Sequence, residues 1–237
     1  FQIGEERIDI GATYVIFGKS TGFDAEFNVG DLQDINGFQT SGGLGDGSEG
    51  IVIRGINTSD QSGYQIAGVR DMDNDGFDEL LIGARQADPN GSNSGQAYLV
   101  FGFDSGAAGI PEIELASLNG TNGYTFNGIN ANDRLGRALD QAGDLNGDGI
   151  VDIVIGAYGS DIAGTNSGAA YVVFGGRTNL DDLDDDDGTL DGKIEMSELL
   201  AINGGDGSKG FVLIGDEVND IAGFAVSAAG DLNGDGF

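Results

Sequence analysis

The most constraining feature of this sequence is a short acidic loop that recurs along the chain and leads into an apolar run. Its most regular copy, DLNGDGIVDIVIGA, has oxygen-bearing side chains at alternate positions, Asp144, Asn146 and Asp148, and then Gly149. Oxygen ligands at positions 1, 3 and 5, followed by a glycine that permits a sharp turn, form the first half of a calcium-binding loop. The pattern therefore predicts loops that bind Ca²⁺.

Each copy supplies three side chains, one backbone carbonyl at position 7 and, where the copy is complete, a carboxylate at position 9. The predicted metal ligands are Asp71, Asp73, Asp75, Phe77 and Glu79 in the first loop, Asp144, Asn146, Asp148, Ile150 and Asp152 in the second, and Asp231, Asn233, Asp235 and Phe237 in the third. Ile82 and Ile155 stand at position 12, where an EF-hand carries an acidic residue, so each loop leads into a strand instead of a helix. Stretches rich in Asp, Asn and Gly also form ordinary turns, and it is the recurrence that favours metal loops.

Composition limits the classes of partner. The 237 residues include 40 acidic and 10 basic side chains, which give a net charge of −30. Such a surface repels nucleic acid and anionic membranes, and bound calcium would neutralise part of its charge. The chain has no Cys, and no apolar run approaches the ~20 residues of a membrane-spanning helix.

Short β-type segments recur around each loop. Before the loops come residues 62–68, 135–143 and 222–230; after them come residues 94–102 and 167–175, which residues 11–18 resemble; each unit then ends in residues 51–55, 124–128 or 211–215. Units of four short strands separated by Gly, Asn, Asp and Ser turns predict an all-β chain, a β-propeller segment of about three four-stranded blades. A β-sandwich is the alternative, but it does not require the periodicity, and a parallel β-helix has a much shorter repeat.

The combination of segment, loop and strand resembles the FG-GAP repeats of integrin α-subunit propellers and of many bacterial secreted proteins. The FG element is degenerate, with Gly63-Tyr64, Gly136-Arg137 and Gly223-Phe224 in its place. The GAP element remains as Gly83-Ala84-Arg85 and Gly156-Ala157-Tyr158, without its proline. The resemblance implies blades of a seven-bladed propeller, structural calcium, an extracellular or cell-surface location, and a role in cell adhesion or protein recognition.

The repeats suggest a division of the whole chain, residues 1–237, as a partial propeller. Residues 1–55 would hold the last three strands of one blade, residues 56–128 the second repeat, and residues 129–215 the third. Residues 216–237 would hold the first strand and the truncated calcium loop of the next blade.

An acidic insert at residues 178–203 distinguishes the third repeat. Asp187, Thr189, Asp191, Gly192, Ile194 and Glu198 fall at EF-hand positions 1, 3, 5, 6, 8 and 12. Thr189 is a weak ligand and no helix-like segment precedes the loop, so we expect a solvated acidic turn that binds no further ion. Residues 113–118 of the previous repeat align with residues 194–199 and lack the loop.

The sequence gives little support for catalysis. Gly18-Lys19-Ser20-Thr21-Gly22 matches a nucleophile elbow, but the chain has no His to act as its base. The recurrent Asp residues are already assigned as metal ligands, so we expect no enzyme activity.

The expected partner is an extracellular protein ligand or a glycan, with no nucleic acid and no direct membrane insertion. A carbohydrate-binding propeller is one alternative, with Tyr64, Tyr158 and Phe224 as aromatic residues that could stack on a sugar, although packing between strands is the favoured explanation for each. A non-catalytic accessory domain of a large secreted hydrolase is another.

Overall fold

The computed structural model describes residues 10–18, 50–104, 112–230 and 234. The strands are β1 (Ala12–Ile16), β2 (Gly50–Arg54), β3 (Gln65–Val69), β4 (Glu79–Ala84), β5 (Gln96–Val100), β6 (Glu112–Glu114), β7 (Gly123–Asn127), β8 (Ala138–Gly143), β9 (Asp152–Ala157), β10 (Ala169–Val173), β11 (Lys193–Glu195) and β12 (Gly210–Ile214). The helices are α1 (Arg177–Asp184) and the 3₁₀ helices η2 (Leu115–Ser117), η3 (Asp185–Asp187), η4 (Met196–Leu199) and η5 (Ala201–Asn203). The predicted all-β class is confirmed.

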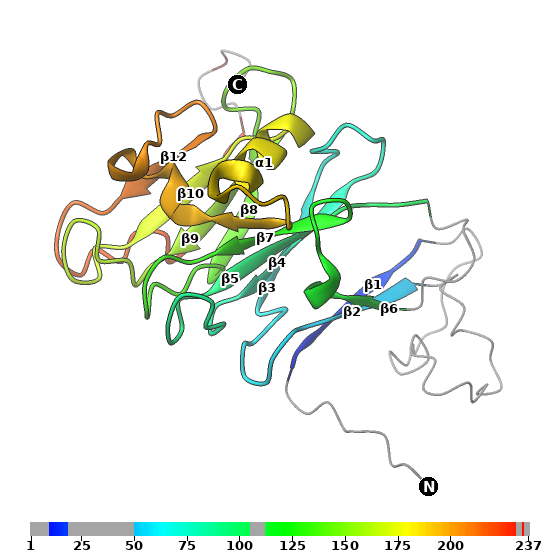
Figure 1. Ribbon diagram of the computed structural model, residues 1–237, viewed down its shortest axis with the longest axis horizontal. Coiled ribbons are helices and arrows are strands. Elements are labelled where there is room, and N and C mark those ends of the chain that lie inside the picture. The colour runs from blue at the N-terminus through cyan, green and yellow to red at the C-terminus, as the bar shows by residue number, and fades with distance from the viewer. Residues whose placement is uncertain (1–9, 19–49, 105–111, 231–233, 235–237) are drawn as a thin grey trace, which may run out of the picture.

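The strands form three sheets that lie side by side (Figure 1). The first sheet has the order β1-β2-β6, the second β11-β7-β5-β4-β3 and the third β12-β10-β9-β8. Neighbouring strands of the same repeat are antiparallel in every sheet. The four strands expected for each complete repeat are therefore present as β3, β4, β5 and β7, and as β8, β9, β10 and β12.

Small residues allow neighbouring sheets to approach closely. A Cβ added to Gly83 in β4 would lie 2.1 Å from the carbonyl oxygen of Gly136, and one added to Gly156 in β9 would lie 2.0 Å from that of Gly223. Real Cβ atoms do not approach a carbonyl oxygen that closely, so only glycine fits at these two positions. The GAP glycines are therefore packing residues between one sheet and the first segment of the next.

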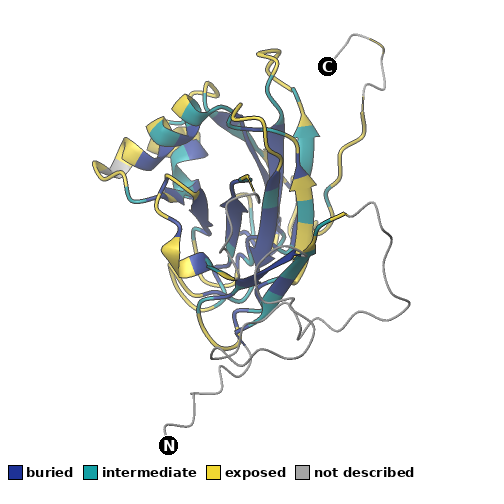
Figure 2. Cartoon of the chain, turned by 90° about the vertical axis from the view of Figure 1, so that its right-hand side faces the viewer, coloured by how far each residue is buried: buried dark blue, intermediate teal, exposed yellow. Residues whose placement is uncertain are grey.

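The apolar side chains that alternate along the strands fill the spaces between sheets. One buried cluster joins the second and third sheets and includes Leu81, Leu99, Ile153 and Tyr171. A second cluster joins the first and second sheets and includes Ile53 and Tyr98. Figure 2 shows the buried strands as a continuous dark-blue interior. Burial of these side chains, together with the backbone pairing, holds the sheets together.

Two short parallel strands extend the sheets in a way that the sequence did not predict. β6 lies between β5 and β7 in the chain but pairs with β2 of the first sheet, with Ile113 opposite Ile53. β11 lies between β10 and β12 but pairs with β7 of the second sheet, with Ile194 opposite Phe126. Each repeat thus adds a strand to the preceding sheet, and the alignment of residues 113–118 with 194–199 is confirmed as a structural equivalence.

The insert corrects one expectation, because a helical segment does precede its loop. α1 and η3 run from Arg177 to Asp187 directly before the loop, and Leu180 and Leu183 of α1 are buried. These two apolar residues lie three positions apart on one face of the helix, but the surrounding acidic residues made the helical pattern hard to recognise in the sequence.

None of the helices in the described part of the chain combines the length and the apolar composition that a membrane crossing requires.

Residues 222–230 also differ from expectation. They were predicted to form the first strand of a further blade, but the described structure gives them a single bridge, from Ala222 to Gly168. β3 and β8 each pair with the strand that follows their own acidic loop. No such partner strand for residues 222–230 is among the described residues, so their backbone has no ladder to join.

Candidate metal centre

The first acidic loop connects β3 to β4 and brings four carboxylates together. One oxygen each from Asp71, Asp73, Asp75 and Glu79 lies within 4.8 Å of the others. A pocket of about 730 Å³ borders Asp73 and Asp75 and opens this cluster to solvent. A different pocket, of about 380 Å³, is lined in part by residues of the acidic insert. The sequence predicted these four residues as ligands, and the structure places them at one point.

The loop is shaped by hydrogen bonds from its own backbone to its own carboxylates. Asp71 Oδ1 accepts a bond of 2.9 Å from the N–H of Asp75, and Asp71 Oδ2 accepts one of 3.0 Å from the N–H of Gly76. Asp75 Oδ1 accepts one of 2.8 Å from the N–H of Phe77, the residue whose carbonyl was predicted as a ligand. Asn74 and Gly76 take positive φ angles of 65° and 97°, conformations that these two residue types adopt most readily. The chain therefore turns so that the acidic side chains converge.

Glu79 is the distinctive member of the cluster because it is only 3% exposed. Its Oε2 accepts a 2.5 Å hydrogen bond from the N–H of Met72, but its buried Oε1 has no hydrogen-bond partner. Burial raises the pKa of Glu79 from 4.5 to about 8, with a further rise from the charges of Asp73, Asp71 and Asp75 and an opposing effect from the Met72 bond. A buried carboxylate oxygen without a donor, beside three more carboxylates, fits a hard cation that prefers oxygen ligands.

A residue of the next repeat also reaches this loop. Gly176, at the start of α1, donates a 2.9 Å hydrogen bond to the carbonyl of Met72. The guanidinium of Arg177 lies 3.6 Å from Asp73 Oδ2 and packs over the ring of Phe101 at 4.8 Å. Arg177 also donates to the carbonyl of Gly120. Sequence reasoning missed this role of Arg177 because Asp73, Phe101 and Gly120 are more than fifty positions away, whereas its only near partner in the described structure is Asp181, an ordinary ion pair within one helix.

The second loop repeats the backbone arrangement between β8 and β9. Asp144 Oδ1 accepts bonds from the N–H groups of Gly147 (2.7 Å) and Asp148 (3.1 Å), and Asp144 Oδ2 accepts one of 2.8 Å from Gly149. Asp148 Oδ1 accepts a bond of 2.8 Å from the N–H of Ile150. The predicted ligands Asp144, Asn146 and Asp148 therefore surround the turn, as Asp71, Asp73 and Asp75 do in the first loop.

The carboxylate at position 9 is arranged differently in the second loop. Asp152 is fully buried, and both of its oxygens accept backbone hydrogen bonds, of 2.7 Å from Leu145 and 2.8 Å from Gly175. Burial raises its pKa as well. Asp152 is one methylene shorter than Glu79, and Asn146 carries no charge, so this loop offers less negative charge to a cation than the first.

The remaining predicted ligands are outside the described structure. Of the third loop only Gly234 is described, so Asp231, Asn233, Asp235 and Phe237 are not placed. The motif at Gly18-Lys19-Ser20-Thr21-Gly22 also lies outside the described residues after Gly18.

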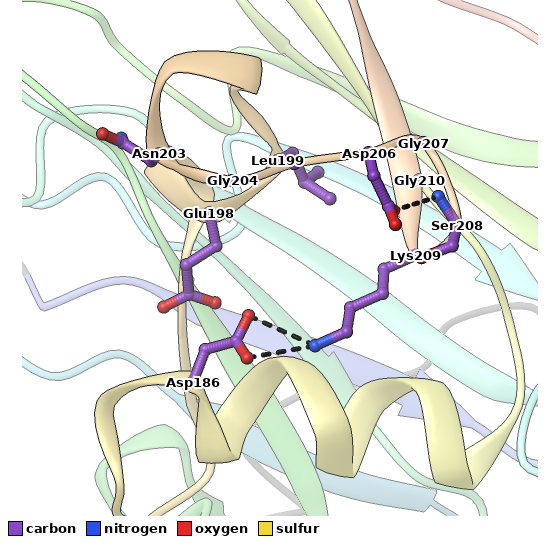
Figure 3. A pocket seen from close by; sticks show the side chains of 11 residues that line it. Asp186, Glu198, Leu199, Asn203, Gly204, Asp206, Gly207, Ser208, Lys209 and Gly210 are labelled. Atoms are coloured by element: carbon purple, nitrogen blue, oxygen red, sulfur yellow. Dashed lines mark hydrogen bonds and ion pairs between the residues drawn. The ribbon is translucent and has the colours of Figure 1, made fainter.

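Most carboxylates described in the acidic insert are engaged in structural contacts. Figure 3 shows the pocket of about 380 Å³ in which the Lys209 ammonium binds Asp186 at 3.1 and 3.2 Å, with Glu198 on its wall. Asp184 accepts bonds of 2.9 and 2.8 Å from the N–H groups of Gly192 and Lys193. Asp191 forms an ion pair with Lys193. The expectation that the insert binds no further ion remains a prediction, and these contacts give its acidic residues a structural role.

Gly149 allows a test of the second loop that changes no ligand. Its φ of +88° is in the left-handed region, where a β-branched residue is strained by about 1–3 kcal/mol. Gly149→Val is therefore expected to weaken calcium binding to this loop, measured by calorimetric titration. Gly149→Asn is the matched control, because Asn74 already adopts a positive φ in the first loop. Equal affinities for the wild type and the Val variant would return this stretch to the class of ordinary turns.

Comparison with known proteins connects this geometry to a family. The FG-GAP repeat model matches residues 62–100 and 136–173, which include both described loops. Phosphatidylinositol-glycan-specific phospholipase D of Bos taurus is 34% identical over 110 residues, covering 45% of this chain and 12% of the relative. Integrin alpha-8 of Gallus gallus is 32% identical over 122 residues, covering 49% of this chain and 10% of the relative.

Integrin alpha pat-2 of Caenorhabditis elegans matches a longer stretch, with 27% identity over 159 residues, 65% of this chain and 12% of the relative. The chain thus covers only about a tenth of the length of these relatives. Both matched repeats contain the acidic loop and the strands on either side of it. The chain therefore carries two FG-GAP repeats, similar to those of integrin α chains, and its sheets are blades of a β-propeller.

Proposed function

We propose that this chain is a calcium-stabilised extracellular recognition module that takes part in cell adhesion or protein binding. The observation that carries the calcium assignment is the cluster of Asp71, Asp73, Asp75 and Glu79, with a buried Glu79 oxygen that has no donor. Ca²⁺ takes six to eight oxygen ligands in flexible geometry, which suits carboxylates and a backbone carbonyl from one loop. When bound, it supplies positive charge at a point where four acidic groups otherwise repel one another.

The role of the ion would be structural. The first loop joins the first and second strands of its blade, and Gly176 and Arg177 of the next repeat contact it. An ion held there would stabilise the turn and, through Asp73, the contact between neighbouring repeats. Asp144, Asn146, Asp148 and Asp152 would hold a second ion more weakly, because fewer charges surround it and both Asp152 oxygens already accept backbone bonds.

The recognition role is supported by similarity to proteins whose names describe them as integrin α chains. The location outside the cell or at its surface, and the absence of catalysis, are part of the same proposal. The similarity to a phospholipase D supports the alternative that this chain is a non-catalytic accessory domain of a larger secreted hydrolase, because the matched region is only 12% of that enzyme.

Calorimetric titration with Ca²⁺ tests the metal assignment. Asp73→Ala is expected to reduce the number of bound ions by one, and Asp148→Ala is expected to weaken or abolish the second site, since each change removes a charged ligand. Asp216→Ala is the control, because Asp216 is exposed and lies outside both loops.

Unchanged stoichiometry and affinity in both loop variants would refute the assignment. A loss of equal size in the Asp216 control would mean that general surface charge, and not the loops, attracts the ion.

A further inference from the structure

Three arginines and three aromatic rings form a continuous row at the ends of the blades opposite the acidic loops. We call Arg85, Tyr64, Arg137, Phe224, Tyr158 and Arg134, in this spatial order, the arginine–aromatic row. Tyr64 directly precedes β3 and Arg85 directly follows β4, whereas the first acidic loop joins the other ends of these two strands. The row therefore lies away from the metal centre and is not part of it.

Consecutive members of the row are in contact. The guanidinium carbon of Arg85 lies 4.0 Å from the ring centre of Tyr64, and that of Arg137 lies 5.1 Å from Tyr64 and 4.4 Å from Phe224. The rings of Phe224 and Tyr158 meet edge to face at 5.3 Å. Arg134 lies 5.5 Å from the Tyr158 ring and donates a hydrogen bond to its hydroxyl. Stacking of a guanidinium on an aromatic face is favourable and limits the motion of both groups.

The row arises from equivalent positions in successive repeats. Tyr64, Arg137 and Phe224 each follow the glycine of the degenerate FG element, and Arg85 and Tyr158 each follow the GAP alanine. The second repeat carries an arginine where its neighbours carry a ring. Arg137 consequently stacks between the rings of the repeats on either side.

The arginines of the row have no carboxylate partner among the described residues. Arg54, Arg177, Lys193 and Lys209 each form an ion pair in the described part of the chain. No such pair is formed there by Arg85, Arg134 or Arg137, although the chain has 40 acidic residues. Three of the ten basic residues are thus gathered on one surface without neutralisation by a described carboxylate.

The stacking leaves the edges of the guanidinium groups for a ligand. A guanidinium that stacks through its face keeps its N–H donors in the ring plane, where they suit the two oxygens of a carboxylate. Arg85 uses Nε for a 2.8 Å bond to Gln61, and Arg134 uses one nitrogen for Tyr158. Tyr64 and Phe224 are 41% and 44% exposed, and Arg85, Arg134, Arg137 and Tyr158 are half-buried, so solvent reaches part of every member of the row.

The same stacking argues against a sugar as the ligand. A sugar would stack on a ring face, but guanidinium groups lie over the rings of Tyr64, Phe224 and Tyr158. The rings hold the arginines in place, and the guanidinium groups over them compete with a pyranose for the ring faces. The row therefore offers fixed, half-buried cationic donors between exposed ring edges.

We propose that the arginine–aromatic row binds closely spaced carboxylates of an acidic segment in a protein partner. This inference rests on the proposed recognition function and names the chemistry of its ligand. The net charge of −30 repels a long polyanion, but at about 0.15 M salt the Debye length is about 8 Å, so a short segment responds mainly to the nearest charges. Fixed guanidinium groups then decide the interaction.

The test uses a fluorescein-labelled oligo-glutamate peptide, with an oligo-glutamine peptide of the same length as its control. Anisotropy is measured at saturating Ca²⁺ and about 0.15 M salt. Arg137→Gln is expected to weaken binding by about tenfold, as the loss of one charged hydrogen-bonded contact predicts. Arg70→Gln is the matched control, because Arg70 is exposed, immediately precedes the first acidic loop, and changes the net charge equally. It is expected to alter binding by less than about twofold.

Further variants keep the test decisive. Arg137→Lys retains the charge but lacks the planar donor fork, so weaker binding is expected here too. If Arg137→Gln fails to fold, Arg85→Gln at the end of the row replaces it, and calcium stoichiometry reports whether each variant is folded.

Equal binding of the glutamine peptide, or equal weakening by Arg70→Gln, would overturn the proposal. Binding of a sulfated oligosaccharide in place of the peptide, with the same dependence on Arg137, would assign the row to a glycan and also overturn it. An absence of peptide binding with normal calcium binding would refute this inference alone, whereas a wild type that binds no calcium would refute the proposed function.

Discussion

Replacing Glu79 with glutamine is expected to make the calcium-free protein more stable than the wild type near pH 8. In the folded wild type the pKa of Glu79 is raised from 4.5 to about 8, chiefly by burial and also by three neighbouring Asp residues. Between these values the folded state keeps a proton that the unfolded state releases, so stability falls as the pH rises through this window. A neutral amide removes this contribution, and its N–H group can donate to the adjacent carboxylates.

The measurement is urea unfolding with a calcium chelator from about pH 5 to pH 8. The wild-type free energy of unfolding should fall across this range, and that of Glu79→Gln should change much less. Burial also raises the pKa values of Asp73 and Asp152, so these groups add to the fall in the wild type and in the variant alike. Asp216→Asn, at an exposed position, should reproduce the wild-type profile.

Calcium should reverse the order of stability. A ligand present at 100 times its dissociation constant stabilises the folded state by about 2.7 kcal/mol, and the variant should lose this gain at the first loop. Thermal unfolding with and without Ca²⁺ measures it. A variant that is stabilised by calcium as much as the wild type would show that Glu79 is not a ligand.

Gly156→Ala is expected to be strongly destabilising, although it adds only one methyl group. That group would lie 2.0 Å from the carbonyl oxygen of Gly223, so β9 and the following segment would have to separate. Overpacking of this kind typically costs 1–3 kcal/mol, and roughly 3 kcal/mol or more is expected here because the obstacle is backbone. Urea unfolding in saturating Ca²⁺ gives the change in free energy.

Gly68→Ala is the matched control, because a Cβ at Gly68 in β3 meets no atom within 4 Å. It should be neutral or stabilising by up to about 1 kcal/mol, since alanine restricts the unfolded chain. If Gly156→Ala were no more destabilising than Gly68→Ala, the close approach between neighbouring repeats would not be a constraint on the fold.

The local features of this protein could be predicted from its sequence. The alternation of Asp144, Asn146 and Asp148 before Gly149 fixes a turn through hydrogen bonds to its own backbone, and the structure shows those bonds. The strands on either side followed from short β-type segments repeated at corresponding places. Both depend on residues close together in the chain, and a repeated pattern makes such signals stronger.

The sequence left the relation between repeats undetermined. β6 and β11 are three residues long, and their pairing with the preceding sheet depends on the position of that sheet. The helix α1 was overlooked because its buried Leu180 and Leu183 stand among acidic residues. A segment this short has little periodicity, and its conformation depends on the apolar surface against which it packs.

The sequence by itself determined the acidic loops, their predicted ligands and the β-rich repeats, because local hydrogen bonding and strand periodicity depend only on residues that are close together in the chain. Only the tertiary structure decided that Glu79 keeps a buried oxygen without a donor whereas both Asp152 oxygens accept backbone bonds. It also decided that Arg177 reaches Asp73 and that Arg137 stacks between Tyr64 and Phe224. These contacts join residues of different repeats, and their energies depend on distances that exist only after the sheets have packed together.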